Sequence, residues 1–486
     1  MAFLVGGANT LDTSYSVENS ARFDNAGGDA LGGTFGTPTN AKTWTLSMWH
    51  KKSSGTTSGG QVLFGARSGY ENFFLHEETI RIDWNNASGG TINWAPLIRD
   101  HSSWYHIVLA HDTSQSTDTN RAKLYINGTQ ITTLRSGVTA NWHNQNLETG
   151  YNVDGVAFYV SSYNGSAAVI NGYLSEVAFI DGSQLAASSF GETDSNGVWV
   201  PKEFKDDVTF GNNGFYLEFK QTGTGTDANG IGADTSGNDN HLAVTNLTSA
   251  SICTDTPTNN FATLNPLYTG RFDDTGFSYS EGNTRIAWTS NNDDKSLATS
   301  TIGVTKGKWY FEAKVIDNSR GIIGVGDMTK IAQFSDAFYD NNPSYGMGVY
   351  LPTGNLQENN SQVDDWSSDV SDNDICMLAL DMDNHRCWFG INGTWQDSGD
   401  PTSGSTGTGD MTTELSDQSH INTGEFIFPF FGDVSVSDQT DMYVNFGNPS
   451  FSISSGNADA NGYGNFEYAP PSGFYALCSK NLAEYG

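Results

Sequence analysis

Two hairpins of the same type, far apart in the chain, most constrain what this sequence can fold into. The first covers residues 104–131 and the second covers residues 374–396. In each, an apolar strand leads through a polar turn into a strand whose side chains alternate, which is the period of a β-strand with one face on a core. Asn127 and Asn392, each followed by glycine, supply the positive φ angles for a tight turn into a third strand. Two such meanders predict two separate antiparallel β-sandwiches.

The composition agrees with an all-β chain of more than one domain. The chain has 486 residues, of which 36% are hydrophobic and 55 are glycine, a balance that favours short strands joined by many polar turns. We expect two jelly-roll sandwiches in tandem, joined by an extended and partly packed linker. The predicted parts are an N-terminal anchoring segment (1–20), a first sandwich (21–205), a connecting strand and linker (206–268) and a second sandwich (269–486).

The net charge of −32 excludes one class of partner. Residues 201–486 carry thirteen basic against thirty-eight acidic side chains, so this surface would repel nucleic acid. No apolar stretch reaches the length of a membrane span, and the start of the chain lacks the basic region of a signal peptide. None of the four cysteines has zinc-site spacing, and we expect buried free thiols, although Cys376 and Cys387 could face each other across the second hairpin.

Several stretches resemble known domain families. WTLSMW, WYHIVLAHD, KLYINGTQI and GYLSEVAFIDGSQL occur in the order found in laminin-G-like, concanavalin-A-like lectin domains, and the match covers residues 20–205. GKWYFE, LDMD, CWFGINGTW and YVNFG resemble the landmarks of the SPRY domain over residues 270–479. Both resemblances imply antiparallel sandwiches. One departure is a long polar insertion at residues 397–425, and loops of this length are usually functional or disordered.

Three further segments resemble virion proteins of tailed phages, particularly marine ones. They are AFLVGGANT with YSVENS near the start, DTPTNNFATLNP in the middle and PPSGFYALCSKNL near the end. Neither domain family requires these segments. The resemblance therefore implies a protein made in the host cytoplasm and located in the virion.

A search for catalytic patterns argues against an enzyme. Glycan hydrolysis needs two carboxylates flanking one bond, and the E-x-D-x-x-E strand of sandwich glucanases is absent from the sequence. Asp381 and Asp383 share a strand face, but they lie at a hairpin turn where aspartates form turn hydrogen bonds. The chain also lacks a G-x-S-x-G elbow, a Walker loop and a dinucleotide fingerprint.

Two loops carry the predicted binding residues, because aromatic faces stack on sugar rings and amides bond their hydroxyls. The candidate ligand-binding residues are Trp142, His143, Tyr151, Asp364, Asp365 and Trp366. For both tryptophans, burial as a core anchor stays open as the alternative. The lectin resemblance also allows a calcium ion near Asp112, Asp118 and Asp154, although no spacing singles out a ligand set.

The leading hypothesis is an oligomeric, non-catalytic virion protein of a tail fibre or appendage that binds a glycan or protein on the host surface. A capsid or tail decoration protein is the alternative, and a polysaccharide depolymerase is the third hypothesis. Phe3, Leu4 and Val5 form an apolar tip, so we expect the N-terminal segment to attach to other virion proteins. The acidic second sandwich would then be distal.

Overall fold

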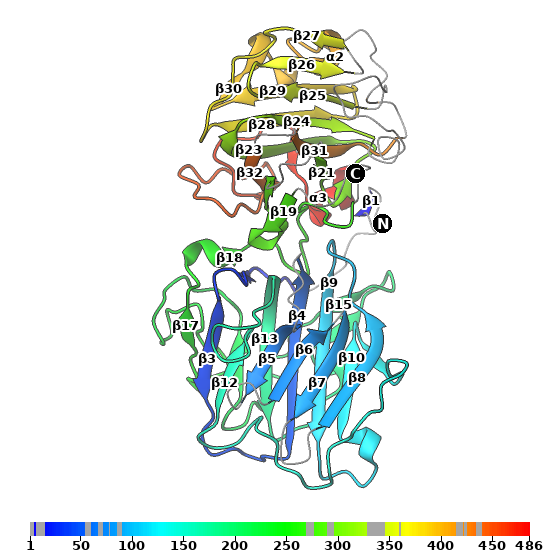
Figure 1. Ribbon diagram of the computed structural model, residues 1–486, viewed down its shortest axis with the longest axis vertical. Helices are drawn as coiled ribbons and strands as arrows, with labels where there is room; N and C mark the ends of the chain where they lie inside the picture. Colours follow the sequence, from blue (N-terminus) through cyan, green and yellow to red (C-terminus); the bar gives the residue numbers. More distant parts are fainter. Residues whose placement is uncertain are drawn as a thin grey trace. The chain divides into compact units, whose positions relative to one another are not determined.

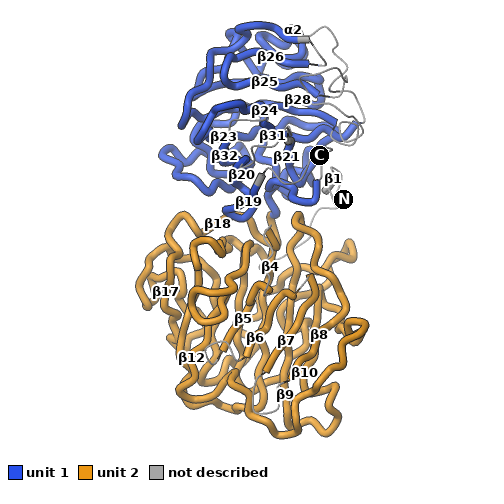
Figure 2. The backbone as a smooth tube through the Cα atoms, viewed as in Figure 1, with its two compact units in different colours: residues 1–10, 260–486 blue, residues 11–259 orange. Residues whose placement is uncertain are grey.

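The computed structural model divides into two compact units whose regular structure is almost all β-strand (Figures 1 and 2). The first unit comprises residues 11–259, and the second comprises residues 260–486 together with residues 1–10. The structure describes residues 4–5, 15–53, 60–66, 71–76, 78–84, 90–268, 277–288, 296–327, 346–358, 361–414, 421, 425–433 and 440–486. The predicted fold class of two antiparallel β-sandwiches is confirmed.

Two large antiparallel sheets form the sandwich of the first unit, and β14 (Gly191–Thr193) and β15 (Trp199–Pro201) form a separate two-stranded sheet. One large sheet runs in the order β11 (Thr129–Ile131), β10 (Ala122–Ile126), β9 (Trp104–Asp112), β4 (Thr43–Lys52), β13 (Gly172–Asp181), β2 (Ser20–Phe23) and β18 (Ile252–Cys253), with β16 (Phe215–Leu217) paired to β13. The other runs in the order β17 (Ala243–Thr245), β3 (Ala30–Thr34), β12 (Ala157–Val160), β5 (Gln61–Ala66), β6 (Glu71–His76), β7 (Thr79–Trp84) and β8 (Gly90–Leu97). The core of the unit lies between these sheets.

The first predicted hairpin is present as β9 and β10. Leu109 lies opposite Leu124 in the ladder, and both side chains are buried between the two sheets. Asn127, with φ of 45°, turns the chain into β11, as its Asn-Gly sequence predicted.

Both faces of the sheet that contains this hairpin are buried. The alternating side chains of β9 predicted that only one face would be buried. Val108, which points away from the core between the sheets, packs against Phe190, Phe204 and Phe210. These side chains belong to residues 185–216, which follow β13 and cover the outer face of the sheet. Phe190, Phe204 and Phe210 lie outside the short strands of this segment, so they show no strand period.

The segment predicted as a connection, residues 206–268, contributes to the first unit as far as residue 259. It supplies β16, β17 and β18, which pair with β13, β3 and β2. In its D-x-SGN-x-NH motif, the Asp234 carboxylate accepts hydrogen bonds from the backbone N–H of Tyr216 and Asn240 and from Ser236. The side-chain amide of Asn238 donates to backbone carbonyls. The polar residues of this motif therefore hold the loop in place.

A buried ion pair joins an early strand of the first unit to its last segment. Lys51 on β4 lies 2.7 Å from the Asp255 carboxylate, and both side chains are essentially inaccessible to solvent. The indole N–H of Trp104 donates to the other carboxylate oxygen at 3.0 Å. A buried charge pair of this kind is tolerated only when its partners are satisfied.

The second unit is also a two-sheet sandwich. One sheet runs in the order β19 (Phe277–Ser280), β20 (Arg285–Trp288), β32 (Thr440–Asn445), β23 (Lys308–Asn318), β28 (Ile375–Asp381), β29 (Arg386–Ile391) and β30 (Thr394–Trp395), with β33 (Tyr475–Ala476) parallel to β23. The other runs in the order β21 (Ser296–Thr299), β31 (Phe428–Asp433), β24 (Gly321–Gly326), β25 (Gly346–Tyr350), β26 (Asn355–Glu358) and β27 (Ser361–Val363).

The second predicted hairpin is β28 and β29, and Asn392, with φ of 49°, turns into β30. Leu378 on β28 points between the sheets, whereas Met377 points to the outer face. There Met377 packs in a cluster with Phe466 and Phe474 from the C-terminal segment. The hairpin sheet of this unit is thus also covered on its outer face.

The segments that resemble phage virion proteins pair with one another within each unit. In the first unit, Val17 exchanges hydrogen bonds with the Thr258 hydroxyl. In the second unit, Phe261 forms a β-bridge with Cys478, and Ala262 donates to the Leu477 carbonyl. The middle segment is therefore bonded to the N-terminal segment in the first unit and to the C-terminal segment in the second.

The N-terminal strand β1 (Leu4–Val5) pairs in parallel with β22 (Ile302–Gly303) of the same chain. We expect the N-terminal segment to attach to other virion proteins, by docking into another chain or pairing with its sheet edge, and this stays a prediction. In the single chain, Leu4 and Val5 pair with an edge of the second unit. Phe3, the third residue of the predicted tip, lies outside the described residues.

Residues 397–414, the longest described part of the polar insertion, fold against β29. They contain two short 3-10 helices and the helix α2 (Met411–Glu414). The indole N–H of Trp388 donates to the Thr408 carbonyl at 2.9 Å, and the Arg386 guanidinium donates to the Asp410 carboxylate at 3.4 Å. These bonds anchor this half of the insertion to the hairpin.

All four cysteines are buried thiols, as predicted. Cys376 lies opposite Ile391 and Cys387 opposite Leu380, so the two thiols of the second hairpin do not face each other. Burial raises the pKa of both thiols. The described part of the chain contains no helix with the length and apolar character of a membrane span.

Candidate functional site

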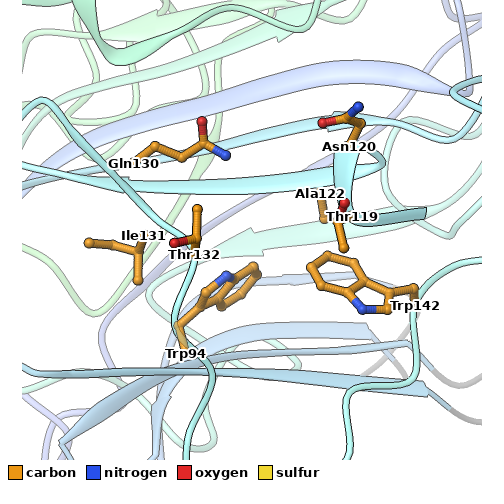
Figure 3. A pocket seen from close by; sticks show the side chains of 8 residues that line it. All are labelled: Trp94, Thr119, Asn120, Ala122, Gln130, Ile131, Thr132 and Trp142. Carbon is orange, nitrogen blue, oxygen red and sulfur yellow. The ribbon is translucent and has the colours of Figure 1, made fainter. Parts of the chain in front are cut away.

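A pocket of about 300 Å³ opens at one side of the first sandwich, where the edge strands of its two sheets come together (Figure 3). β8 forms one side, and β10, β11 and the 3-10 turn η2 (Asp118–Asn120) form the other. A bridge between Trp94 and Leu134 ties the two edges together. The lining residues are Trp94, Thr119, Asn120, Ala122, Gln130, Ile131, Thr132 and Trp142.

Two indoles lie along one side of this pocket, and Asn120 and Gln130 lie on the other (Figure 3). Trp142 is partly exposed, whereas Trp94 is 1% exposed and packs into the core. Flat aromatic faces stack on the apolar face of a sugar ring, and amides donate to and accept from its hydroxyls. The arrangement has the chemistry of a carbohydrate site.

The backbone on both sides of Trp142 is fixed. Asn141 donates its backbone N–H to the Thr91 carbonyl on β8 at 2.9 Å. On the other side, the Arg121 guanidinium donates to the His143 carbonyl at 2.7 Å. The loop that carries Trp142 is therefore held in place before any ligand arrives, which lowers the entropy lost on binding.

Of the three residues predicted in this loop, only Trp142 lines the pocket. The His143 ring is buried and stacks on Trp84, with ring centroids 3.6 Å apart. Burial lowers the pKa of His143 well below the usual histidine value. Tyr151 is also buried, between Trp44 and Phe64 in the core. Both side chains support the loop and present no surface to a ligand in this structure.

In the predicted loop of the second sandwich, one residue is again buried and the others are exposed. Trp366 is 8% exposed and packs in the core between the sheets, which is the core-anchor alternative. Asp364 and Asp365 are exposed. The Asp364 carboxylate accepts hydrogen bonds from Asn355 at 3.2 Å and Gln362 at 2.7 Å. These contacts stabilise the turn after β27.

The sequence did not single out most of the pocket. Trp94 is the single aromatic residue of β8, and its position looks like an ordinary core position. Asn120, Gln130 and Thr132 belong to residue types that are abundant in every loop of this chain. The one sequence feature that pointed to this part of the fold is the Asn-Gly turn at Asn127, because it places β11 at the edge of the sheet beside the pocket.

The aspartates considered for calcium do not form a ligand set. The Asp112 carboxylate accepts hydrogen bonds from Thr43, Ser114 and Gln115. Asp118 accepts from the N–H of its neighbour, and Asp154 from a threonine hydroxyl at 3.5 Å. Within the described ranges, no three histidine, cysteine or acidic side chains come together in a group that could hold a metal ion. The three carboxylates therefore accept separate hydrogen bonds and do not converge on one point.

One buried carboxyl has a pKa near neutral pH. Glu176 occupies a β-bulge on β13 with φ of 52°, and burial raises its pKa to about 7. Its carboxylate accepts hydrogen bonds from the hydroxyls of Tyr15 and Tyr216. The side chain is 4% exposed, so a substrate cannot reach it in this structure. Glu176 acts as a structural group beneath the outer layer.

Comparison with known families supports the lectin fold of the first unit. Residues 27–188 match the family model described as the concanavalin A-like lectin/glucanases superfamily. No curated protein sequence matches the chain.

Solved structures that are similar to parts of the chain include SPRY domains. The SPRY domain of human HERC1 is 15% identical with a TM-score of 0.27, and the match covers 37% of this chain and 96% of that domain. The PSpry domain of TRIM65 is 10% identical with a TM-score of 0.26, covering 38% and 89%. A Bacteroides ovatus protein described as a candidate carbohydrate binding protein is 14% identical with a TM-score of 0.33, covering 48% of this chain and 58% of that chain. At these identities and TM-scores, the likeness says nothing about what the chain binds.

Proposed function

We propose that the chain is a non-catalytic structural protein of a tailed-phage virion, in a tail fibre or similar appendage, that binds a glycan on the host surface. The pocket beside Trp142 is the observation that carries the binding part of this proposal. It combines Trp94 on β8 and Trp142 on a fixed loop with amide and hydroxyl side chains, in a sandwich of lectin type.

The virion part of the proposal is supported by the three sequence segments that resemble phage proteins. We propose that the protein oligomerises and that residues 1–20 attach it to other virion proteins, with the second sandwich distal. The absence of a paired-carboxylate strand and the inaccessibility of Glu176 favour binding without hydrolysis.

The experiment uses the purified full chain and a panel of marine bacterial strains. We expect the fluorescently labelled protein to bind some strains, and mild periodate oxidation of those cells to abolish binding because it destroys vicinal hydroxyls. Antibodies against the protein should label tails or fibre tips of virions that carry it. Label over the whole head would favour a decoration protein, and sustained release of reducing ends from cell glycans would favour a depolymerase.

A further inference from the structure

The pocket beside Trp142 contains no charged side chain, although the chain as a whole has a net charge of −32. Arg121 and Lys123 are the basic residues next to its lining in sequence. The Arg121 guanidinium donates to the carbonyls of Gln115, Ser116 and His143. Lys123 follows Ala122 on β10, so it points to the opposite face of the strand. A carboxylate bound in this pocket would therefore meet no available cation among these residues.

The lining offers hydrogen bonds that the protein itself does not use. The side chains of Thr119, Asn120, Gln130 and Thr132 make no hydrogen bond to any other described residue. Each of the two amides has donors and an acceptor, and each hydroxyl can act as either. Such groups match the hydroxyls of an uncharged sugar, whose oxygens also donate and accept.

The size of the pocket limits the ligand. Its volume of about 300 Å³ lies at the lower end of the range for small-molecule sites. This space suits one sugar ring stacked on an indole, with the rest of a glycan outside. The lining residues Thr119 and Asn120 lie in the loop between β9 and β10, which begins after Asp112. The Asp112 carboxylate is engaged in hydrogen bonds with Thr43, Ser114 and Gln115.

We infer that this pocket binds one uncharged hexopyranose unit, stacked on Trp142 and bonded by Asn120 and Gln130, without a metal ion. The inference rests on the proposed glycan-binding function and names the class of sugar. Arg121 is a positioning residue, since its bond to the His143 carbonyl holds the backbone of Trp142.

Saturation-transfer NMR on the full chain tests this inference. The uncharged probes are the methyl pyranosides of glucose, galactose and mannose, and the charged probes are the methyl glycosides of glucuronic acid and N-acetylneuraminic acid. We expect at least one uncharged probe to bind with millimolar affinity, in EDTA and equally at low and high salt. The charged probes should give no signal.

Substitutions locate the bound sugar. Trp142→Ala should weaken binding about tenfold or more, Trp142→Phe should restore part of the affinity, and Gln130→Ala should weaken it several-fold. Tyr163→Ala removes a 37% exposed aromatic side chain elsewhere in the same unit and should leave binding unchanged. Gln130 is exposed, so its variant reports on the pocket even if replacing Trp142 disturbs the loop.

Several results would overturn the inference: no binding of any uncharged probe, equal binding of the charged probes, dependence on calcium, or unchanged binding by both Trp142→Ala and Gln130→Ala. The cell assay separates this failure from failure of the proposed function. If Trp142→Ala protein still binds cells as strongly as the unsubstituted chain, attachment stands and the pocket is not its site. If the unsubstituted chain binds no cells, the proposed attachment to the host is wrong. Binding of the sugar probes then tests the pocket independently.

Discussion

In the first unit residues 185–216 cover the hairpin sheet, and in the second unit the C-terminal segment around Phe466 and Phe474 covers the equivalent sheet. A carboxyl is buried in each unit, but their partners differ. Glu176 accepts from two tyrosine hydroxyls, whereas Glu312 accepts from Tyr310, from Asn445 and from two backbone N–H groups. Burial raises the pKa of both carboxyls. The two carboxyls beneath similar outer layers therefore have different requirements. An uncharged side chain with one acceptor oxygen can replace Glu176, whereas the site of Glu312 needs an acceptor for each of four donors.

The two units differ further in buried histidine. Seven of the nine histidines lie in the first 259 residues, and His106 shows how they are held. Its Nδ1 accepts from the indole N–H of Trp199 at 3.0 Å, so in the neutral ring the proton is on Nε2, which donates to Ser47 at 2.9 Å. A second proton on His106 would break the bond to Trp199.

The largest expected effect is a selective loss of the first unit in acid. Burial lowers the pKa of His50 to about 4 and of His106 and His111 to about 3. Unfolded histidines bind protons near pH 6.5, so below that value the unfolded state holds more protons and the stability of the first unit falls as pH falls. Each such histidine should cost on the order of 1–2 kcal/mol of unfolding free energy at about pH 5.

Urea unfolding with pulsed hydrogen–deuterium exchange and mass spectrometry would measure this effect, because peptides report on each unit separately. The second unit is the internal control, since only two of the nine histidines of the sequence lie after residue 259. Equal acid sensitivity of both units would contradict the comparison.

A smaller effect is expected from breaking the buried ion pair. Asp255→Ala should destabilise the first unit by about 3–5 kcal/mol, because it removes a carboxylate from the buried Lys51 ammonium and from Trp104. The matched change in the second unit is Asp441→Ala. It breaks a pair in which the Arg285 side chain is 34% exposed, and it should cost about 1 kcal/mol or less. Comparable losses in denaturant midpoint for the two variants would show that burial does not distinguish the pairs.

The smallest effect separates the two buried carboxyls. Glu176 titrates at about pH 7 when folded and near 4.5 when unfolded, so its contribution to stability falls as pH rises through this interval. Glu176→Gln keeps an acceptor for both phenols, and above pH 7 it should raise stability by about 1–3 kcal/mol, with little change at about pH 5. Glu312→Gln should lower stability by about 1–3 kcal/mol at either pH, because its amide NH₂ would face backbone donors. Thermal unfolding at both pH values measures these changes, and the same sign for both variants above pH 7 would refute the distinction.

The sequence predicted those parts of the fold that follow a local rule. The hairpins follow from strand alternation, and the turns at Asn127 and Asn392 follow from the need for positive φ. The outer layer escaped prediction because Phe190, Phe204 and Phe210 lie at irregular spacings in segments without strand period. Their burial depends on contacts with a sheet formed elsewhere in the chain.

The candidate site was predicted only through Trp142. An aromatic residue among amides indicates either a platform or a core anchor, and only the tertiary structure separates Trp142 from Trp366. The partners of Trp142 come from β8, η2 and β11, which no sequence spacing relates to its loop. Such a site arises from the meeting of two sheet edges.

The pairing of Lys51 with Asp255 sets an order of events during synthesis. Residues 21–205 leave the ribosome before Asp255 has been made, so the sheet can form while its buried ammonium still lacks that carboxylate. N-terminal domains generally fold while the chain is still growing, but this one reaches its final stability late. The segment that delivers Asp255 runs directly into the second unit, so completion of the first sandwich coincides with the emergence of the next. A translation pause once Asp255 has left the ribosome would give the first unit time to close before the second begins to fold.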